Sequence, residues 1–173
     1  VSEIHKDALA RRRIELSFVP YGTQIAEPTP FTTIDNIVLP NLEKMGITNT
    51  GAALTKALDS LDERKVTYNN NGVPYYQSIL ILISDGLSMD DLSPASMRIK
   101  ELEANKKLSF FAIGIEGADL TQMSTIGSRT ALALQGMKFD ELFQWLSASV
   151  AGVSSSQPGD KVALPSPAGW AEL

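Results

Sequence analysis

Two short segments of this sequence carry oxygen-bearing side chains of the kind that bind a hard divalent cation. The first, residues 46–51, reads Gly-Ile-Thr-Asn-Thr-Gly and contains Thr48. The second, residues 84–91, follows an apolar run, reads Ser-Asp-Gly-Leu-Ser-Met-Asp-Asp and contains Asp85. Magnesium prefers oxygen ligands in an octahedral arrangement and keeps several of its waters. A threonine hydroxyl and an aspartate carboxylate could therefore share one ion if the fold brings them together.

Each of these residues also has an ordinary structural interpretation. Asp85, at the end of a strand, could serve as a general base or a helix cap as well as a metal ligand, and Thr48 could be a helix N-cap. Asp90 and Asp91 could be solvated acids that precede a helix. A third polar segment, residues 114–119, follows the next apolar run. Taken singly, the segments leave these alternatives open.

The composition describes one mildly acidic domain. The chain has 173 residues, with 15 Lys and Arg against 20 Asp and Glu, one His and no Cys, which gives a formal net charge of −5. Hydrophobic residues make up 43% of the chain, so a core of ordinary size can form. The lack of cysteine excludes disulfides, thiolate zinc sites, iron–sulfur clusters and catalytic thiols. A single histidine excludes His-rich metal-hydrolase motifs.

Location and partners are also restricted by the sequence. The longest apolar runs, residues 79–83 and 108–115, are far shorter than the ~20 residues that cross a bilayer, and no signal peptide opens the chain. We therefore expect a cytoplasmic protein without a membrane partner. No dense stripe of Lys and Arg exists apart from residues 11–13, which argues against nucleic acid as a partner.

Periodicity predicts strands that alternate with helices along the chain. We expect strands at residues 14–19, 25–31, 79–83, 108–115 and 131–134, and helices at residues 1–12, 40–45, 53–61, 93–105, 120–126 and 139–153. The run at 79–83 is continuously apolar, as a strand buried on both faces requires. This order predicts an α/β fold with a parallel sheet that binds ligands at the carboxyl ends of its strands. The loops with Thr48 and Asp85 lie at that edge.

In this order and spacing the segments resemble the von Willebrand factor type A (VWA) domain. The match covers about residues 1–155 and rests on the strand at 14–22, the threonine loop at 46–54, the apolar strand ending in Asp-Gly at 79–86, and the strand at 111–115. The helix at 139–149 is most similar to the bacterial cytosolic branch associated with tellurite resistance and stress operons. The resemblance implies a three-layer, doubly wound, Rossmann-like fold whose mainly parallel sheet has one antiparallel edge strand.

The resemblance also implies a function. In VWA domains a divalent cation, usually Mg²⁺, sits at the strand ends in a metal-ion-dependent adhesion site, where a carboxylate of a partner protein completes the ligand shell. By resemblance, Thr48 takes the role of the loop threonine and Asp85 that of the aspartate. The expected protein is a non-enzymatic binding module for an acidic residue of a protein partner, with Mg²⁺ as cofactor and no catalytic residues.

The sequence departs from the family at one motif. Asp-x-Ser-x-Ser, which supplies further metal ligands after the family's first strand, occurs nowhere in the chain. We therefore expect a VWA-like domain at residues 1–155 that lacks its first strand, with a Pro- and Gly-punctuated tail at 156–173. The expected reason is that the natural chain begins upstream.

Two alternative functions stay open. One is a degenerate, metal-free VWA scaffold that pairs its open sheet with a partner strand. The other is an enzyme on an α/β sheet, a hydrolase or a phosphoreceiver. Against the hydrolase, the chain has no Gly-x-Ser-x-Gly elbow, and its one histidine, His5, precedes any plausible nucleophile. Against a phosphoreceiver, Asp85 would need clustered acids from elsewhere to hold its metal.

Overall fold

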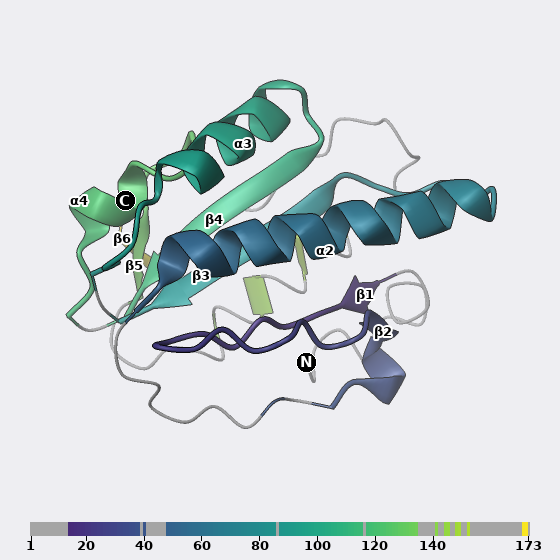
Figure 1. Ribbon diagram of the computed structural model, residues 1–173, viewed down its shortest axis with the longest axis horizontal. Helices are drawn as coiled ribbons and strands as arrows, with labels where there is room; N and C mark the ends of the chain where they lie inside the picture. Colours follow the sequence, from purple (N-terminus) through teal and green to yellow (C-terminus); the bar gives the residue numbers. More distant parts are fainter. Residues whose placement is uncertain are drawn as a thin grey trace.

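A computed structural model of the chain describes residues 14–38, 40, 48–85, 87–115 and 117–134, together with 141, 144, 145, 148, 149, 152, 171 and 172. Among these, the strands are β1 Glu15–Leu16, β2 Thr32–Thr33, β3 Ser78–Ser84, β4 Leu108–Gly114, β5 Leu132–Leu134 and β6 Ala171–Glu172. The helices are η2 Ile34–Asn36, α2 Thr50–Asn70, α3 Ser93–Ala104 and α4 Leu120–Ser124 (Figure 1). No helix in this described part is long and apolar enough to cross a membrane.

The strands of the larger sheet follow the order β3-β4-β5-β6. β3, β4 and β5 run parallel, with Ser78 opposite Leu108 and Ser84 opposite Gly114. β6 joins β5 in the antiparallel direction, so the end of the predicted tail lies at the edge of this sheet. Parallel strands need a crossover between them, and α3 supplies it between β3 and β4. The α/β fold with a mainly parallel sheet and an antiparallel edge strand is confirmed.

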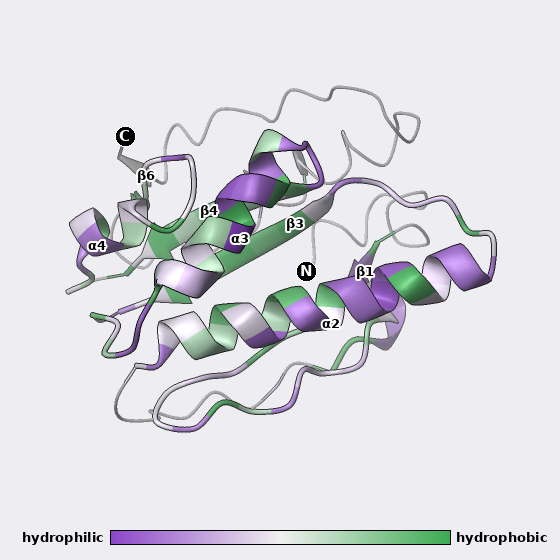
Figure 2. Cartoon of the chain, turned by 45° about the horizontal axis from the view of Figure 1, so that its top comes forward, coloured by the Kyte–Doolittle hydropathy of each residue, from purple (hydrophilic) through white to green (hydrophobic). Residues whose placement is uncertain are grey.

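β4 is the centre of the core because alternate side chains are buried on its two faces. Leu108, Phe110 and Ala112 belong to one cluster, which α2, α3 and α4 cover with Leu54, Leu58, Ala95, Ile99 and Met123. Phe111 and Ile113 belong to the other cluster, where Trp145 meets Phe111 edge to face at 5.1 Å between ring centroids. In Figure 2 the hydrophobic colour runs along β3 and β4 beneath the two long helices. Both faces of β4 are therefore covered.

A buried carboxylate joins α3, β4 and the loop before β5. The Glu103 side chain is only 6% exposed. Its Oε1 accepts hydrogen bonds from Nη1 of Arg129 at 2.5 Å and from the Phe110 N–H at 3.2 Å, and its Oε2 accepts from the Ser128 N–H at 2.7 Å. The Arg129 guanidinium also lies 5.0 Å above the ring of Phe111. One side chain on α3 thus satisfies three donors, one from β4 and two from the loop before β5.

β3 does not have the burial that its continuous apolar run predicted. Of the five Ile and Leu residues at 79–83, only Leu82 is buried, and Ile83 is 37% exposed. The reason is position, because among the described residues β3 pairs with β4 on one side only. The composition of β3 is that of a central strand, but among the described strands β3 lies at the edge of its sheet.

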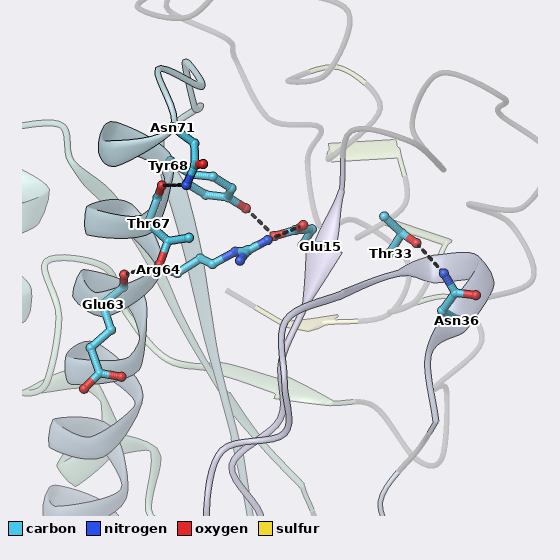
Figure 3. Close-up of polar contacts among 8 residues, drawn as sticks. All are labelled: Glu15, Thr33, Asn36, Glu63, Arg64, Thr67, Tyr68 and Asn71. Atoms are coloured by element: carbon cyan, nitrogen blue, oxygen red, sulfur yellow. Dashed lines mark hydrogen bonds and ion pairs between the residues drawn. The ribbon is translucent and has the colours of Figure 1, made fainter.

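The ribbon of β1 and β2 forms a separate two-stranded sheet. Side chains tie it to the far half of α2, as Figure 3 shows. Nε and Nη2 of Arg64 donate to the two carboxylate oxygens of Glu15 at 2.7 and 2.5 Å, and the Tyr68 hydroxyl donates to the same carboxylate. Such a bidentate pair fixes orientation as well as distance. α2 therefore contacts both sheets, although no described backbone pair joins them.

Several predicted boundaries are wrong for identifiable reasons. The edge strand expected at 25–31 lies instead at β2, because Pro28 and Pro30 have no N–H to donate to a ladder. The helix expected at 53–61 extends from Thr50 to Asn70, and it ends before Gly72, whose φ is 65°. The helix expected at 1–12 lies outside the described residues, as does all but Pro40 of the helix expected at 40–45. Most of 139–153 also lies outside them, and its described members are helical.

Candidate functional site

The two predicted ligands lie at one edge of the structure. Thr48 is half-buried, two residues before the start of α2, and Asp85 is exposed directly after β3. The loop that follows Asp85 returns to Thr48, because the Met89 N–H donates to the Thr48 carbonyl oxygen at 2.9 Å. Neither the Thr48 hydroxyl nor the Asp85 carboxylate forms a hydrogen bond or ion pair with another described residue. No described residue therefore occupies the polar atoms of either side chain.

Tyr21 lies between these two segments, a role that sequence reasoning missed. Its hydroxyl donates to the Ile83 carbonyl oxygen at 3.4 Å and is hydrogen-bonded with the Thr50 and Ser84 side chains. Burial raises the pKa of Tyr21, and the hydrogen bonds with Ser84 and Thr50 offset only part of this rise. The phenol of Tyr21 therefore lies at the end of β3, close to Asp85. The only sequence signal was a tyrosine in the turn at a strand's carboxyl end.

Asp90 caps α2 from a distant part of the chain. Its Oδ1 accepts from the Gly51 N–H at 3.0 Å, and its Oδ2 accepts from the Ala52 N–H at 2.8 Å. The residue at the N-cap position, Asn49, makes no such bond, because its amide donates to a loop carbonyl instead. The first turn of a helix leaves its N–H groups without partners, and Asp90 satisfies two of them. Thr48 is not the cap, and Asp90 is not a solvated acid.

Hydrogen bonds also fix the charge of Asp90. Burial acts to raise the pKa of Asp90, but the Ser88 hydroxyl, which donates to Oδ1 at 2.6 Å, and the two helix amides outweigh it and lower the pKa. Asp91 is exposed, and the Ser93 N–H, which donates to it at 2.9 Å, lowers its pKa. Both oxygens of the Asp90 carboxylate therefore accept hydrogen bonds, whereas the Asp85 carboxylate accepts none from a described residue.

Gly51 permits the close approach of the loop to α2. A Cβ at this position would collide with the carbonyl oxygen of Asp91 and would lie 3.1 Å from Oδ2 of Asp90. Alanine normally favours a helix over glycine by about 1 kcal/mol. Here we expect Gly51→Ala to lower the free energy of unfolding by about 1–2 kcal/mol, because the loop must move.

Urea denaturation measures this effect. The control is Ala52→Gly at the next, exposed position, where only helix propensity changes and a loss of about 1 kcal/mol is expected. A Gly51→Ala protein as stable as the parent, or more stable, would contradict the close approach.

The third polar segment, residues 114–119, has a structural role. Gly117 has a φ of 94°, and a Cβ there would lie 3.5 Å from the Asp85 carbonyl oxygen. Asp119 is the N-cap of α4, and its carboxylate accepts from the Gln122 N–H at 2.9 Å. This segment therefore packs beside the candidate site and starts α4.

The donor set fits a hard cation in part. No three His, Cys, Asp or Glu side chains come together among the residues that the structure describes. The edge instead offers the carboxylate of Asp85 and the hydroxyl of Thr48, neither of which is paired with another described residue. Magnesium needs only one or two carboxylates and retains waters, so this sparse set suits it and leaves ligand positions open. The described residues supply at most two of its ligands.

Comparison with known proteins identifies the family of the chain. A family model, that of the von Willebrand factor type A domain, matches residues 4–145. The chain belongs to this family. VWA domains are generally adhesion or interaction modules rather than enzymes.

One similar protein is the collagen alpha-6(VI) chain of Homo sapiens, which is 31% identical to this VWA domain over 105 residues. The match covers 60% of this chain and 4% of the collagen chain. The chain therefore spans only a small fraction of the length of that relative.

Proposed function

We propose that this VWA domain binds an acidic side chain of a partner protein through a Mg²⁺ ion held by Thr48 and Asp85. The observation that carries the proposal is that these two side chains lie at one edge, where neither has a hydrogen-bond partner among the described residues. One carboxylate cannot neutralise a divalent ion, so positive charge remains on the metal. A carboxylate from the partner supplies the missing charge and a further ligand.

The charge of this edge makes the metal necessary. Asp85, Asp90 and Asp91 all lie on the loop after β3, and no Lys or Arg occurs between β3 and Arg98. Without a cation, this loop repels an acidic partner. Binding of such a partner is therefore expected to require Mg²⁺ and to be lost when a chelator removes it.

We also infer that one strand is missing between β1 and β3, so that residues 1–155 form an incomplete VWA domain. α2 contacts Glu15 of the ribbon through Arg64, and it covers Leu82 of β3 through Leu54. Yet no described backbone pair links the two sheets. An added strand parallel to β3 would cover its half-buried Ile and Leu side chains. Its carboxyl end would then lie next to Asp85, where it could supply the remaining ligands.

Substitution of the two ligands tests the metal site. We expect Thr48→Ala and Asp85→Asn each to weaken Mn²⁺ or Mg²⁺ binding by at least about tenfold, roughly 1.4 kcal/mol, because a sparsely ligated ion loses a large share of its protein ligands. Titration calorimetry measures this on the 173-residue chain and on a version extended upstream through an apolar strand.

Asp91→Asn is the matched control, because it removes the same charge from the same loop without removing a proposed ligand. It should bind metal nearly as tightly as the parent. Parental affinity in Asp85→Asn and Thr48→Ala would remove both assignments.

A metal-free scaffold that accepts a strand from a partner is the second candidate. The observation that favours it is the edge of β3, which no described strand covers. If neither the shorter nor the extended chain binds metal, and the shorter chain already unfolds cooperatively, this candidate replaces the first.

We also propose a bacterial cytoplasmic setting, in a stress or tellurite-resistance system. This proposal is supported by the resemblance of residues 139–149 to the bacterial cytosolic branch of the family. The described members of this segment are helical and include the buried Trp145. This setting is tested by growing a bacterial strain that lacks the gene in medium containing tellurite. If its sensitivity to tellurite equals that of the parent strain, the tellurite context is wrong.

A further inference from the structure

The side chain of Gln122 on α4 holds the loop after β3. Its Oε1 accepts a hydrogen bond from the Ser88 N–H at 2.7 Å, and its Nε2 donates to the Ser88 carbonyl oxygen at 3.3 Å. One amide group thus engages both backbone groups of a single loop residue. The backbone of Gln122 is itself held by the Asp119 carboxylate.

The contacts continue from Ser88 to the start of α2. The Ser88 hydroxyl donates to Asp90, and Asp90 accepts from the Gly51 and Ala52 N–H groups. The next loop residue, Met89, donates to the Thr48 carbonyl oxygen. The loop is therefore fastened to α4 on one side and to α2 on the other.

α4 is seated closely on the sheet at the point from which Gln122 projects. A Cβ at Gly114 of β4 would lie 2.5 Å from the Leu120 side chain and 2.8 Å from that of Ala118. Met123 of α4 is 3% exposed and belongs to the core. Because α4 packs this tightly, Gln122 extends from a fixed support.

We propose that Gln122 is a positioning residue of the candidate site, which sets the spacing of Thr48 and Asp85 by fixing residues 87–91. The inference rests on the proposed function for its consequence, because the spacing matters only if both residues bind one ion. Gln122 itself touches neither ligand side chain among its recorded contacts. Its effect passes through Ser88 and Met89 to the carbonyl of Thr48.

The test compares three variants of the full chain. Gln122→Met keeps the length of the side chain but removes both hydrogen bonds. We expect exchange of the Ser88 amide hydrogen, followed by NMR, to accelerate by about fivefold to tenfold, with smaller increases at Gly51 and Ala52. Mn²⁺ affinity should fall by about threefold or more. Gln122→Glu retains the oxygen that accepts the shorter hydrogen bond. It should therefore restore most of the slow exchange at Ser88 and most of the Mn²⁺ affinity. Thr121→Ala, an exposed neighbour, should change neither.

The two measurements separate the inference from the proposed function. Unchanged exchange at Ser88, Gly51 and Ala52 in Gln122→Met overturns the positioning role. Faster exchange with unaltered Mn²⁺ affinity also overturns it, because the ligand spacing would then be independent of the loop. If the unmodified protein and its upstream-extended version bind no Mn²⁺, the proposed metal function fails, and exchange alone decides whether Gln122 holds the loop.

Discussion

Glu103→Ala is expected to lower the free energy of unfolding by about 2–4 kcal/mol, the largest effect of any substitution considered for this fold. The carboxylate is almost fully buried and accepts from two backbone N–H groups and from Arg129. Alanine leaves the N–H groups of Phe110 and Ser128 without this partner. Because Arg129 is half exposed, its charge can return to water, which keeps the loss below the upper range for a buried ion pair.

Urea denaturation followed by circular dichroism measures this loss. The control is Glu101→Ala on the exposed side of the same helix, which should change stability by less than about 0.5 kcal/mol. Glu103→Gln keeps one acceptor oxygen, so its stability should lie between those of the Glu103→Ala and Glu101→Ala proteins. Equal stability of the Glu103→Ala and Glu101→Ala proteins would show that the buried carboxylate does not hold α3 to β4.

Asp90→Ala is expected to lower the free energy of unfolding by about 2–3 kcal/mol at neutral pH. The substitution removes both the cap of α2 and the hydrogen bond that holds the neighbouring loop. The Gly51 and Ala52 N–H groups lose their acceptor, and Ser88 loses the partner of its hydroxyl. Thermal and urea unfolding both report the loss. Asp85→Asn is the control, because the carboxylate of Asp85 accepts no hydrogen bond from a described residue.

The contribution of Asp90 also depends on pH. The pKa of Asp90 is lower in the folded protein than in the unfolded chain, so folding favours the ionised form. Its stabilisation is therefore complete above the unfolded pKa of about 3.9 and is lost as the pH falls through the folded value. The stability difference between the parent and Asp90→Asn should narrow steadily below about pH 4. A difference that stays constant down to the acid transition would contradict an ionised cap.

Local pattern was sufficient to predict the elements whose structure depends on their own residues. The strand β4 follows from its apolar run, and α3 begins with the predicted Ser93 and Pro94. The burial of β3 could not be predicted in this way, because burial depends on what lies beside a strand. A continuous apolar run indicates a central strand, but no described strand pairs with β3 on the side away from β4.

The candidate site also has features that could be predicted from the sequence and features that could not. Thr48 and Asp85 could be placed at one edge because parallel strands share the direction of their carboxyl ends. The role of Asp90 could not be inferred, because the helix amides that it caps lie 38 and 39 positions earlier in the chain. Gln122 likewise contacts Ser88 across 34 positions. Hydrogen bonds between distant loops leave no periodic signal in a sequence.

The edge of β3 that no described strand covers has a consequence for the behaviour of the protein in solution. The strand carries five consecutive Ile and Leu residues, with no charged residue or proline to block pairing. Proteins usually protect such edges, because an unpaired apolar strand is a template for the same strand of another copy. The chain studied alone should therefore aggregate as its concentration rises, with β3 as the nucleus. A strand paired with this edge would protect the protein from association with its own copies.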